Sequence, residues 1–222
     1  MSGLPLQALL FDLDGTLIDS APDLGGAGND LRARHGLAPL PLADYRPMTG
    51  AGARGLLGVA FGIGPEHADF EALKTEFLAL YEARMTRETR VFAAMEPVLA
   101  ALEARGLPWG IVTNKASRFA APLVQALGLA QRSAVLICGD SAARAKPWPD
   151  PLLLAAERLG VAPARCAYVG DDLRDIQAAR AAGMLSVAAG WGYLGAGEPI
   201  ERWNADRRAD LPQQLLPALD LA

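Results

Sequence analysis

The feature that most constrains the fold is a repeated alternation between short apolar segments and helical segments. Each apolar segment is the length of a strand, and such runs are typical of strands buried on both faces of a sheet. Several of the helical segments that separate them end at a glycine, a common stop signal. Alternation of this kind predicts an α/β fold built on a parallel, doubly wound sheet. The predicted strands are Ala8–Phe11, Trp109–Thr113, Ala134–Cys138, Ala167–Gly170 and Ser186–Ala189.

The segment from about Ser20 to Thr89 departs from this alternation. It has helical periodicity and lacks convincing strand patterns, and five apolar residues within it share one helical face. We therefore predict a separate helical domain at residues 20–89, inserted into a core domain made of residues 1–19 and 90–222. The residues of the helical face are Phe70, Leu73, Phe77, Leu80 and Tyr81.

Composition excludes several classes of partner. The chain has 222 residues and a formal net charge of −4, so it has no overall electrostatic attraction for nucleic acid or an anionic membrane. No apolar stretch reaches transmembrane length. Its two cysteines, Cys138 and Cys166, fall at predicted buried strands and are expected to be reduced. We expect a cytoplasmic protein that binds neither nucleic acid nor membrane.

Two carboxylates follow the first predicted strand. Asp12 and Asp14 are two residues apart, so in extended chain they point the same way, at the strand end where α/β sheets bind ligands. Gly15 permits a sharp turn after them. Two converging negative charges are costly unless a cation lies between them, and Mg²⁺ prefers oxygen ligands of this kind. The pair therefore predicts a Mg²⁺ site with a carboxylate available for covalent chemistry.

Further polar residues follow the later strands. Thr113 and Asn114 end the second predicted strand, where a hydroxyl or an amide can bind a phosphoryl oxygen. Lys146 lies in a proline-rich stretch that would hold its charge in place. Asp171 follows the fourth strand, and Asp175 lies one helical turn later. All of these residues are expected at the same edge of the sheet.

These four segments resemble, in order, the four motifs of the haloacid dehalogenase (HAD) superfamily, and the resemblance covers nearly the whole chain. It implies a Rossmann-like HAD core with a helical cap of the C1 type, and a Mg²⁺-dependent phosphatase. The segments are Phe11-Asp12-Leu13-Asp14-Gly15-Thr16, Ile111–Lys115, Lys146-Pro147-Trp148-Pro149 and Gly170-Asp171 with Asp175.

The resemblance also implies a role for each motif residue. Asp12 would be the nucleophile that becomes an aspartyl-phosphate, and Asp14 the acid and base. Thr113 and Lys146 complete the catalytic group. Asp12, the Asp14 backbone carbonyl and Asp171 would bind the metal, with Asp175 orienting this group. Asn114 and Gly15 would contact the substrate, and Asp172 is expected to cap the helix that follows.

The whole chain looks most like enzymes of the phosphoglycolate phosphatase type. Phosphatases of N-acetylmuramic acid 6-phosphate are an alternative, and so is a β-phosphoglucomutase, because all share the motifs. Asp14 argues against a dehalogenase or a phosphonatase, which lack this second aspartate. A non-catalytic binding protein would tolerate loss of motif residues such as Asp12 or Lys146, and neither is lost. The expected substrate is a small phosphorylated metabolite.

Substrate recognition is less constrained. The glycine-rich turn Thr49–Gly55 opens a helix of the inserted domain, and it either binds an anion through its N–H groups and Arg54 or is a plain loop. We expect Arg54 to bind the substrate. Lys115 is either solvated or reaches the substrate. The loop Gly190–Tyr193 is either near the site or a structural corner, and Trp148 packs on the core or faces a partner.

Overall fold

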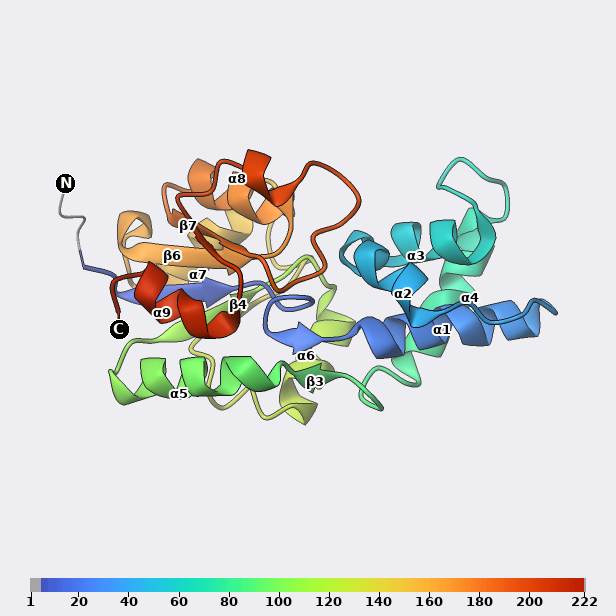
Figure 1. The fold of residues 1–222 in the computed structure, drawn as a ribbon, viewed down its shortest axis with the longest axis horizontal. Helices are drawn as coiled ribbons and strands as arrows, with labels where there is room; N and C mark the ends of the chain where they lie inside the picture. Colours follow the sequence, from blue (N-terminus) through green and yellow to red (C-terminus); the bar gives the residue numbers. More distant parts are fainter. Residues whose placement is uncertain (1–4, 222) are drawn as a thin grey trace.

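The computed structural model describes residues 5–221. It shows a sheet with helices on both faces and, at one end of the sheet, a group of helices coloured blue to cyan in Figure 1. No helix within residues 5–221 is both long and apolar enough to cross a membrane.

The central sheet has six strands in the order β5-β4-β1-β6-β7-β8, and all neighbouring pairs are parallel. This confirms the predicted doubly wound α/β fold. The first strand, β1, lies between β4 and β6, in register through Phe11 with Ile111 and Val169. The carboxyl ends of three strands therefore meet at one edge. The strands are β1 (Ala8–Phe11), β4 (Trp109–Val112), β5 (Leu136–Ile137), β6 (Cys166–Gly170), β7 (Leu185–Ala189) and β8 (Arg207–Ala209).

Alternate residues of each strand face different helical layers. In β1, Leu9 and Phe11 pack in one core cluster while Ala8 and Leu10 pack in another. Helices α5 (Glu96–Ala104), α6 (Ser117–Ala126) and α9 (Leu215–Ala218) cover the first face. Helices α7 (Asp150–Leu159) and α8 (Leu173–Ala181) cover the second. Because both faces are covered, all four residues of β1 are fully buried.

Four helices form the group at the end of the sheet: α1 (Ala21–Arg34), α2 (Leu42–Tyr45), α3 (Gly52–Phe61) and α4 (Phe70–Glu82), with a 3₁₀ turn at Arg46–Ala51. They enclose their own core cluster, which Phe119 of α6 joins. Of the predicted apolar stripe on α4, Phe70, Leu73, Phe77 and Tyr81 are buried and Leu80 is partly buried. Residues 1–4 and 222 of the predicted core domain lie outside the described residues.

The chain passes between the sheet and the helical group twice, through a two-stranded antiparallel ladder. Strand β2 (Ile18–Asp19) pairs with β3 (Arg90–Val91). Beside this ladder, the buried carboxylate of Asp23 at the start of α1 accepts hydrogen bonds from the returning segment. Its Oδ2 lies 2.9 Å from the Glu88 nitrogen and 2.8 Å from both the nitrogen and the hydroxyl of Thr89. One carboxylate thus joins both crossings.

Candidate active site

A cavity of about 230 Å³ lies where the carboxyl ends of β1, β4 and β6 meet the helical group. Most of the residues that the sequence predicts for the site line this one cavity: Asp12, Asp14, Thr113, Asn114, Lys146, Asp171 and Asp175. Leu24 and the segment Thr49–Gly52 line it from the helical group. The arrangement places a polar, acidic floor beneath a loop of small residues.

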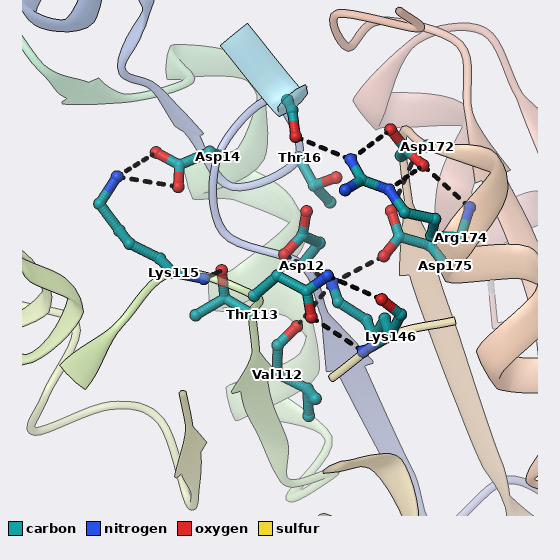
Figure 2. Close-up of polar contacts among 12 residues, drawn as sticks. Asp12, Asp14, Thr16, Val112, Thr113, Lys115, Lys146, Asp172, Arg174 and Asp175 are labelled. Carbon is teal, nitrogen blue, oxygen red and sulfur yellow. Dashed lines mark hydrogen bonds and ion pairs between the residues drawn. The ribbon is translucent and has the colours of Figure 1, made fainter. Parts of the chain in front are cut away.

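Lys146 joins two of the carboxylates on this floor (Figure 2). Its Nζ donates to Asp12 Oδ1 at 2.9 Å, to Asp175 Oδ1 at 2.7 Å and to the Tyr168 hydroxyl at 2.7 Å. Tyr168 in turn donates to the Val112 carbonyl at 2.7 Å. Burial alone would lower the pKa of Lys146, but the negative charges of Asp12 and Asp175 raise it above its ordinary value. Lys146 is therefore a charged ammonium at neutral pH.

Asn114 fixes the backbone of that lysine. Its amide donates to the Lys146 carbonyl at 2.9 Å and accepts from the Lys146 nitrogen at 2.9 Å. Both polar ends of the amide are thus paired with the chain, so the side chain positions Lys146 in this structure. Thr113 accepts a hydrogen bond from the Lys115 nitrogen at 3.2 Å, which leaves its hydroxyl proton available to a ligand.

Asp171 is held deep in the site. Its Oδ1 accepts from the Thr16 hydroxyl at 2.7 Å and its Oδ2 from the Tyr193 nitrogen at 2.8 Å. Burial raises the pKa of Asp171 well above its ordinary value, and the charges of Asp12 and Asp175 raise it further. Gly15, with a φ of 87°, passes so close that a Cβ there would overlap the Asp171 carboxylate. Glycine at this position lets the loop after β1 lie against the acid.

The carboxylates fit a hard divalent cation. One oxygen from each of Asp12, Asp171 and Asp175 lies within 4.8 Å of the others. Within residues 5–221, the ammonium of Lys146 is the salt-bridge partner of both Asp12 and Asp175. Burial and the charges of Asp12 and Asp175 raise the pKa of Asp171, so its ionised form needs further positive charge nearby. A cation with oxygen preference would supply the missing charge.

Asp14 also lines the cavity, but its carboxylate is turned away from Asp12 and toward Lys115 (Figure 2). Lys115 Nζ lies 3.1 and 3.0 Å from its two oxygens, and the Ser20 hydroxyl donates to Oδ1 at 2.5 Å. Strand β1 ends at Phe11, and the chain bends at Leu13, between the two aspartates. Because of this bend, their carboxylates do not point to one spot as the sequence pattern predicts.

Asp172 caps α8, as expected from the sequence. Its Oδ1 accepts from the Arg174 nitrogen at 2.9 Å, and Asp175 Oδ2 accepts from the Asp172 nitrogen at 3.1 Å. The Arg174 guanidinium also pairs with both Asp172 oxygens and donates to the Gly50 carbonyl at 2.7 Å. Arg174 therefore connects α8 directly to the loop of the helical group that lines the cavity.

Arg54 lies elsewhere. It is exposed and lines a neighbouring cavity of about 210 Å³, together with the Gly195–Glu198 segment and Trp203. It lies in the first turn of α3 and does not line the cavity that holds Asp12, so a contact between Arg54 and a ligand on Asp12 remains a prediction. Trp148 is 53% exposed, with the Arg144 guanidinium stacked over its ring at 4.2 Å.

Several residues that organise the site were not predicted individually. Thr16 binds Asp171, Tyr168 binds Lys146, and Ser20 binds Asp14. Tyr193, in a loop whose role the sequence leaves open, accepts from the backbone nitrogens of Ser20 and Ala21 through its hydroxyl at 2.8 and 3.0 Å. The sequence signals were a threonine directly after the glycine turn and a tyrosine within an otherwise apolar strand.

Comparisons with known proteins agree with this arrangement. A model of the haloacid dehalogenase-like hydrolase family matches residues 6–183. The chain is 50% identical over 213 residues to the phosphoglycolate phosphatase of Xanthomonas campestris pv. campestris, with 94% of each chain covered. It is also 43% identical over 222 residues to the N-acetylmuramic acid 6-phosphate phosphatase of Pseudomonas aeruginosa. That match covers 100% of this chain and 98% of the relative.

Among solved structures, the chain resembles that of a predicted phosphoglycolate phosphatase from Haemophilus somnus 129pt. The TM-score is 0.83 at 27% identity, and the match covers 96% of this chain and 97% of that one. The similarity therefore includes the helical group as well as the sheet. Sequence, fold and site geometry lead to one conclusion: this chain belongs to the haloacid dehalogenase-like hydrolase family.

Proposed function

We propose that this hydrolase is a Mg²⁺-dependent phosphatase that releases phosphate from small phosphorylated metabolites through an aspartyl-phosphate. The observation that carries the proposal is the position of Asp12. Its carboxylate follows the central strand, is held by the Lys146 ammonium at 2.9 Å, and shares a cavity with Asp14 and Asp171. Nucleophile, acid and charge-balancing groups are thus within one site.

In the first step, Asp12 attacks phosphorus. A bond forms between an Asp12 oxygen and phosphorus, the bond from phosphorus to the ester oxygen breaks, and Asp14, protonated from solvent, gives its proton to the leaving oxygen. Lys146 and Thr113 line the same cavity, and in this proposal the ammonium and the hydroxyl bind phosphoryl oxygens. The product alcohol then leaves.

In the second step, water hydrolyses the acyl-phosphate. Asp14, now a carboxylate, removes a proton from water as its oxygen attacks phosphorus, and the bond from phosphorus to the Asp12 oxygen breaks. Inorganic phosphate and the free Asp12 carboxylate result. Asp12, Asp171 and the Asp14 carbonyl would hold Mg²⁺, which would supply positive charge for the phosphoryl oxygens. Asp175 accepts a hydrogen bond from Lys146 and so keeps the lysine beside Asp12.

The similarity to known enzymes suggests two substrates. Phosphoglycolate is the first, because identity to a phosphoglycolate phosphatase reaches 50%. N-acetylmuramic acid 6-phosphate is the second, because the 43% match to that phosphatase spans the full chain.

The test is a panel of phosphomonoesters assayed for phosphate release with excess Mg²⁺. The panel contains phosphoglycolate, N-acetylmuramic acid 6-phosphate, β-glucose 1-phosphate and p-nitrophenyl phosphate. We expect hydrolysis of the generic aryl ester and a preference for one of the first two. Conversion of β-glucose 1-phosphate to the 6-phosphate, dependent on glucose 1,6-bisphosphate, would instead identify a mutase. Absence of phosphate release from every ester would refute the proposal.

A further inference from the structure

Lys115 contacts both the acid of the proposed reaction and the helical group. Its ammonium binds the two Asp14 oxygens at 3.1 and 3.0 Å and lies 4.7 Å from the centre of the Tyr81 ring on α4. The lysine follows β4, whereas Tyr81 belongs to the helical group. This side chain therefore spans the junction between the two parts of the molecule.

Lys115 is confined to the site. Its side chain is only 9% exposed, and it lines the same cavity as Asp12 and Lys146. A buried ammonium needs a negative partner, because removing one member of a buried pair leaves an unbalanced charge. Within the described residues, the salt-bridge partner of Lys115 is Asp14. The ammonium thus favours any state in which a carboxylate remains beside it.

This pairing conflicts with the proposed chemistry. Asp14 must reach the ester oxygen of a phosphate held at Asp12, yet its carboxylate points toward Lys115 and away from Asp12 (Figure 2). If Asp14 rotated without a replacement, the Lys115 ammonium would be buried and unpaired. A substrate that brings its own carboxylate to Lys115 removes this penalty.

We propose that Lys115 determines specificity by exchanging partners: a substrate carboxylate takes the place of Asp14 on the ammonium and releases Asp14 toward the leaving oxygen. The inference rests on the proposed phosphatase function and assigns a residue to the selection of substrates. In phosphoglycolate the carboxylate is bonded to the carbon that carries the ester oxygen, so one small molecule presents both groups. An ester without a carboxylate leaves Asp14 paired with Lys115.

The experiment compares phosphoglycolate with 2-hydroxyethyl phosphate, in which a neutral alcohol replaces the carboxylate. The kcat/KM ratio of the two esters is measured for the wild type, for Lys115→Met and for Lys74→Met. Lys74 is the matched control, because it lies on the exposed face of α4 and pairs with Glu71. Circular dichroism and thermal melting check that each variant is folded.

We expect the wild type to prefer phosphoglycolate by at least about tenfold. In Lys115→Met that preference should fall by roughly 10- to 150-fold, the value of one charge-assisted hydrogen bond. Hydrolysis of 2-hydroxyethyl phosphate should fall less than hydrolysis of phosphoglycolate, because this ester brings no carboxylate to residue 115. Lys74→Met should keep the wild-type ratio.

Equal losses on both esters in Lys115→Met would overturn the proposal and leave Lys115 as a support for Asp14. The wild type alone provides a second test, which holds even if Lys115→Met does not fold. If the wild type hydrolyses p-nitrophenyl phosphate with Mg²⁺ but does not prefer phosphoglycolate to 2-hydroxyethyl phosphate, the proposed exchange of partners on Lys115 is wrong. The phosphatase function then stands. If the wild type hydrolyses none of these esters, the proposed function itself fails.

Discussion

Two aspartates only two residues apart have different surroundings in this site. Asp12 is bound by the Lys146 ammonium on the cavity floor, and Asp14 by Lys115 and Ser20 at the side of the cavity. A bend at Leu13 separates them. Because each carboxylate has its own lysine, substitutions at the two positions should give different kinetic results.

Asp14→Asn should slow alkyl phosphates far more than aryl phosphates. An alkoxide needs a proton to leave and p-nitrophenolate does not, so we expect losses of about 10²- to 10⁴-fold on alkyl esters and less than about tenfold on the aryl ester. Asp12→Asn is the matched control, and it should cost about 10³-fold or more on both, since an amide cannot form the acyl-phosphate. The measurement is steady-state kinetics of both variants on both types of ester. If Asp14→Asn slows both esters equally, Asp14 positions other groups and does not transfer the proton.

Asp171 should give metal-free protein a distinctive pH dependence. The pKa of Asp171 is raised well above its ordinary value, and burial raises that of Asp175 to about 6. Between the unfolded pKa, about 3.9, and these values, the folded chain binds more protons than the unfolded chain. The free energy of unfolding therefore decreases as pH rises from about 4 through about 6.

The measurement is thermal melting in EDTA and in excess Mg²⁺, for the wild type and for Asp171→Asn. In EDTA the wild type should lose stability relative to the variant as pH rises. Mg²⁺ should restore the wild type and shift the variant far less, because a ligand that binds only the folded state stabilises it. An equal Mg²⁺ shift in both proteins would show that Asp171 does not bind the metal.

At the scale of elements, helix α8 begins at the site and contributes to it. Asp172 caps its first turn, Asp175 reaches Lys146, and Arg174 binds the loop at Gly50. One short helix thus positions an acid on the cavity floor and a contact on the cavity roof. Its start should be sensitive to substitution for two separable reasons, the cap and the ion pair.

Asp172→Ala should destabilise the protein by about 1 kcal/mol, within the range of 0.5–2 for loss of an N-cap. Asp172→Ser keeps a capping oxygen but loses the pair with Arg174, so it should cost less than half as much. Urea unfolding of the two variants separates the effects. If serine is as costly as alanine, the ion pair rather than the cap holds this turn.

The sequence predicted the elements that apolar runs define and missed those that they do not. Strands β1, β4, β6 and β7 lie within a residue of their predicted bounds because buried parallel strands are continuously apolar. Strand β5 is shorter than predicted, and β8 was missed because it carries two exposed arginines at the edge of the sheet. Two-residue strands such as β2 and β3 have too few residues to form a pattern.

The site shows the same division. Motif residues at strand ends line one cavity because a parallel sheet aligns the carboxyl ends of its strands. Arg54 could not be placed, since the direction of α3 depends on packing within the helical group. The contacts of Tyr168 and Tyr193 could not be predicted either, because their hydroxyls bind segments that are distant in the sequence.

At the scale of the whole molecule, the two crossings between the sheet and the helical group are joined. The β2–β3 ladder pairs Ile18 with Val91 and Asp19 with Arg90, and Asp23 binds the returning backbone. Arg84 approaches the second oxygen of Asp23, with 3.5 Å between its Nε and Oδ1. The buried charge of Asp23 is therefore surrounded by donors from one short segment.

Asp23→Ala should be strongly destabilising, by about 3 kcal/mol or more, because it removes three hydrogen bonds and leaves Arg84 without its buried partner. Asp30→Ala is the matched control. Asp30 also pairs with Arg84, at 2.8 Å, but its side chain is half exposed, and such pairs contribute about 0.2–1 kcal/mol. Chemical denaturation gives the free energy of unfolding of both variants. A similar, small loss of stability in each would mean that Asp23 is dispensable.

The paired crossings have a consequence for how the helical group can move. Two independent linkers would allow it to twist, slide and tilt relative to the sheet. Linkers that are hydrogen-bonded to each other must bend together, so the remaining freedom is close to a rotation about a single axis through the ladder. The Thr49–Gly52 loop, which lines the cavity, and Tyr81, which lies beside Lys115, would then move together relative to the sheet, so a ligand that holds one would also fix the other.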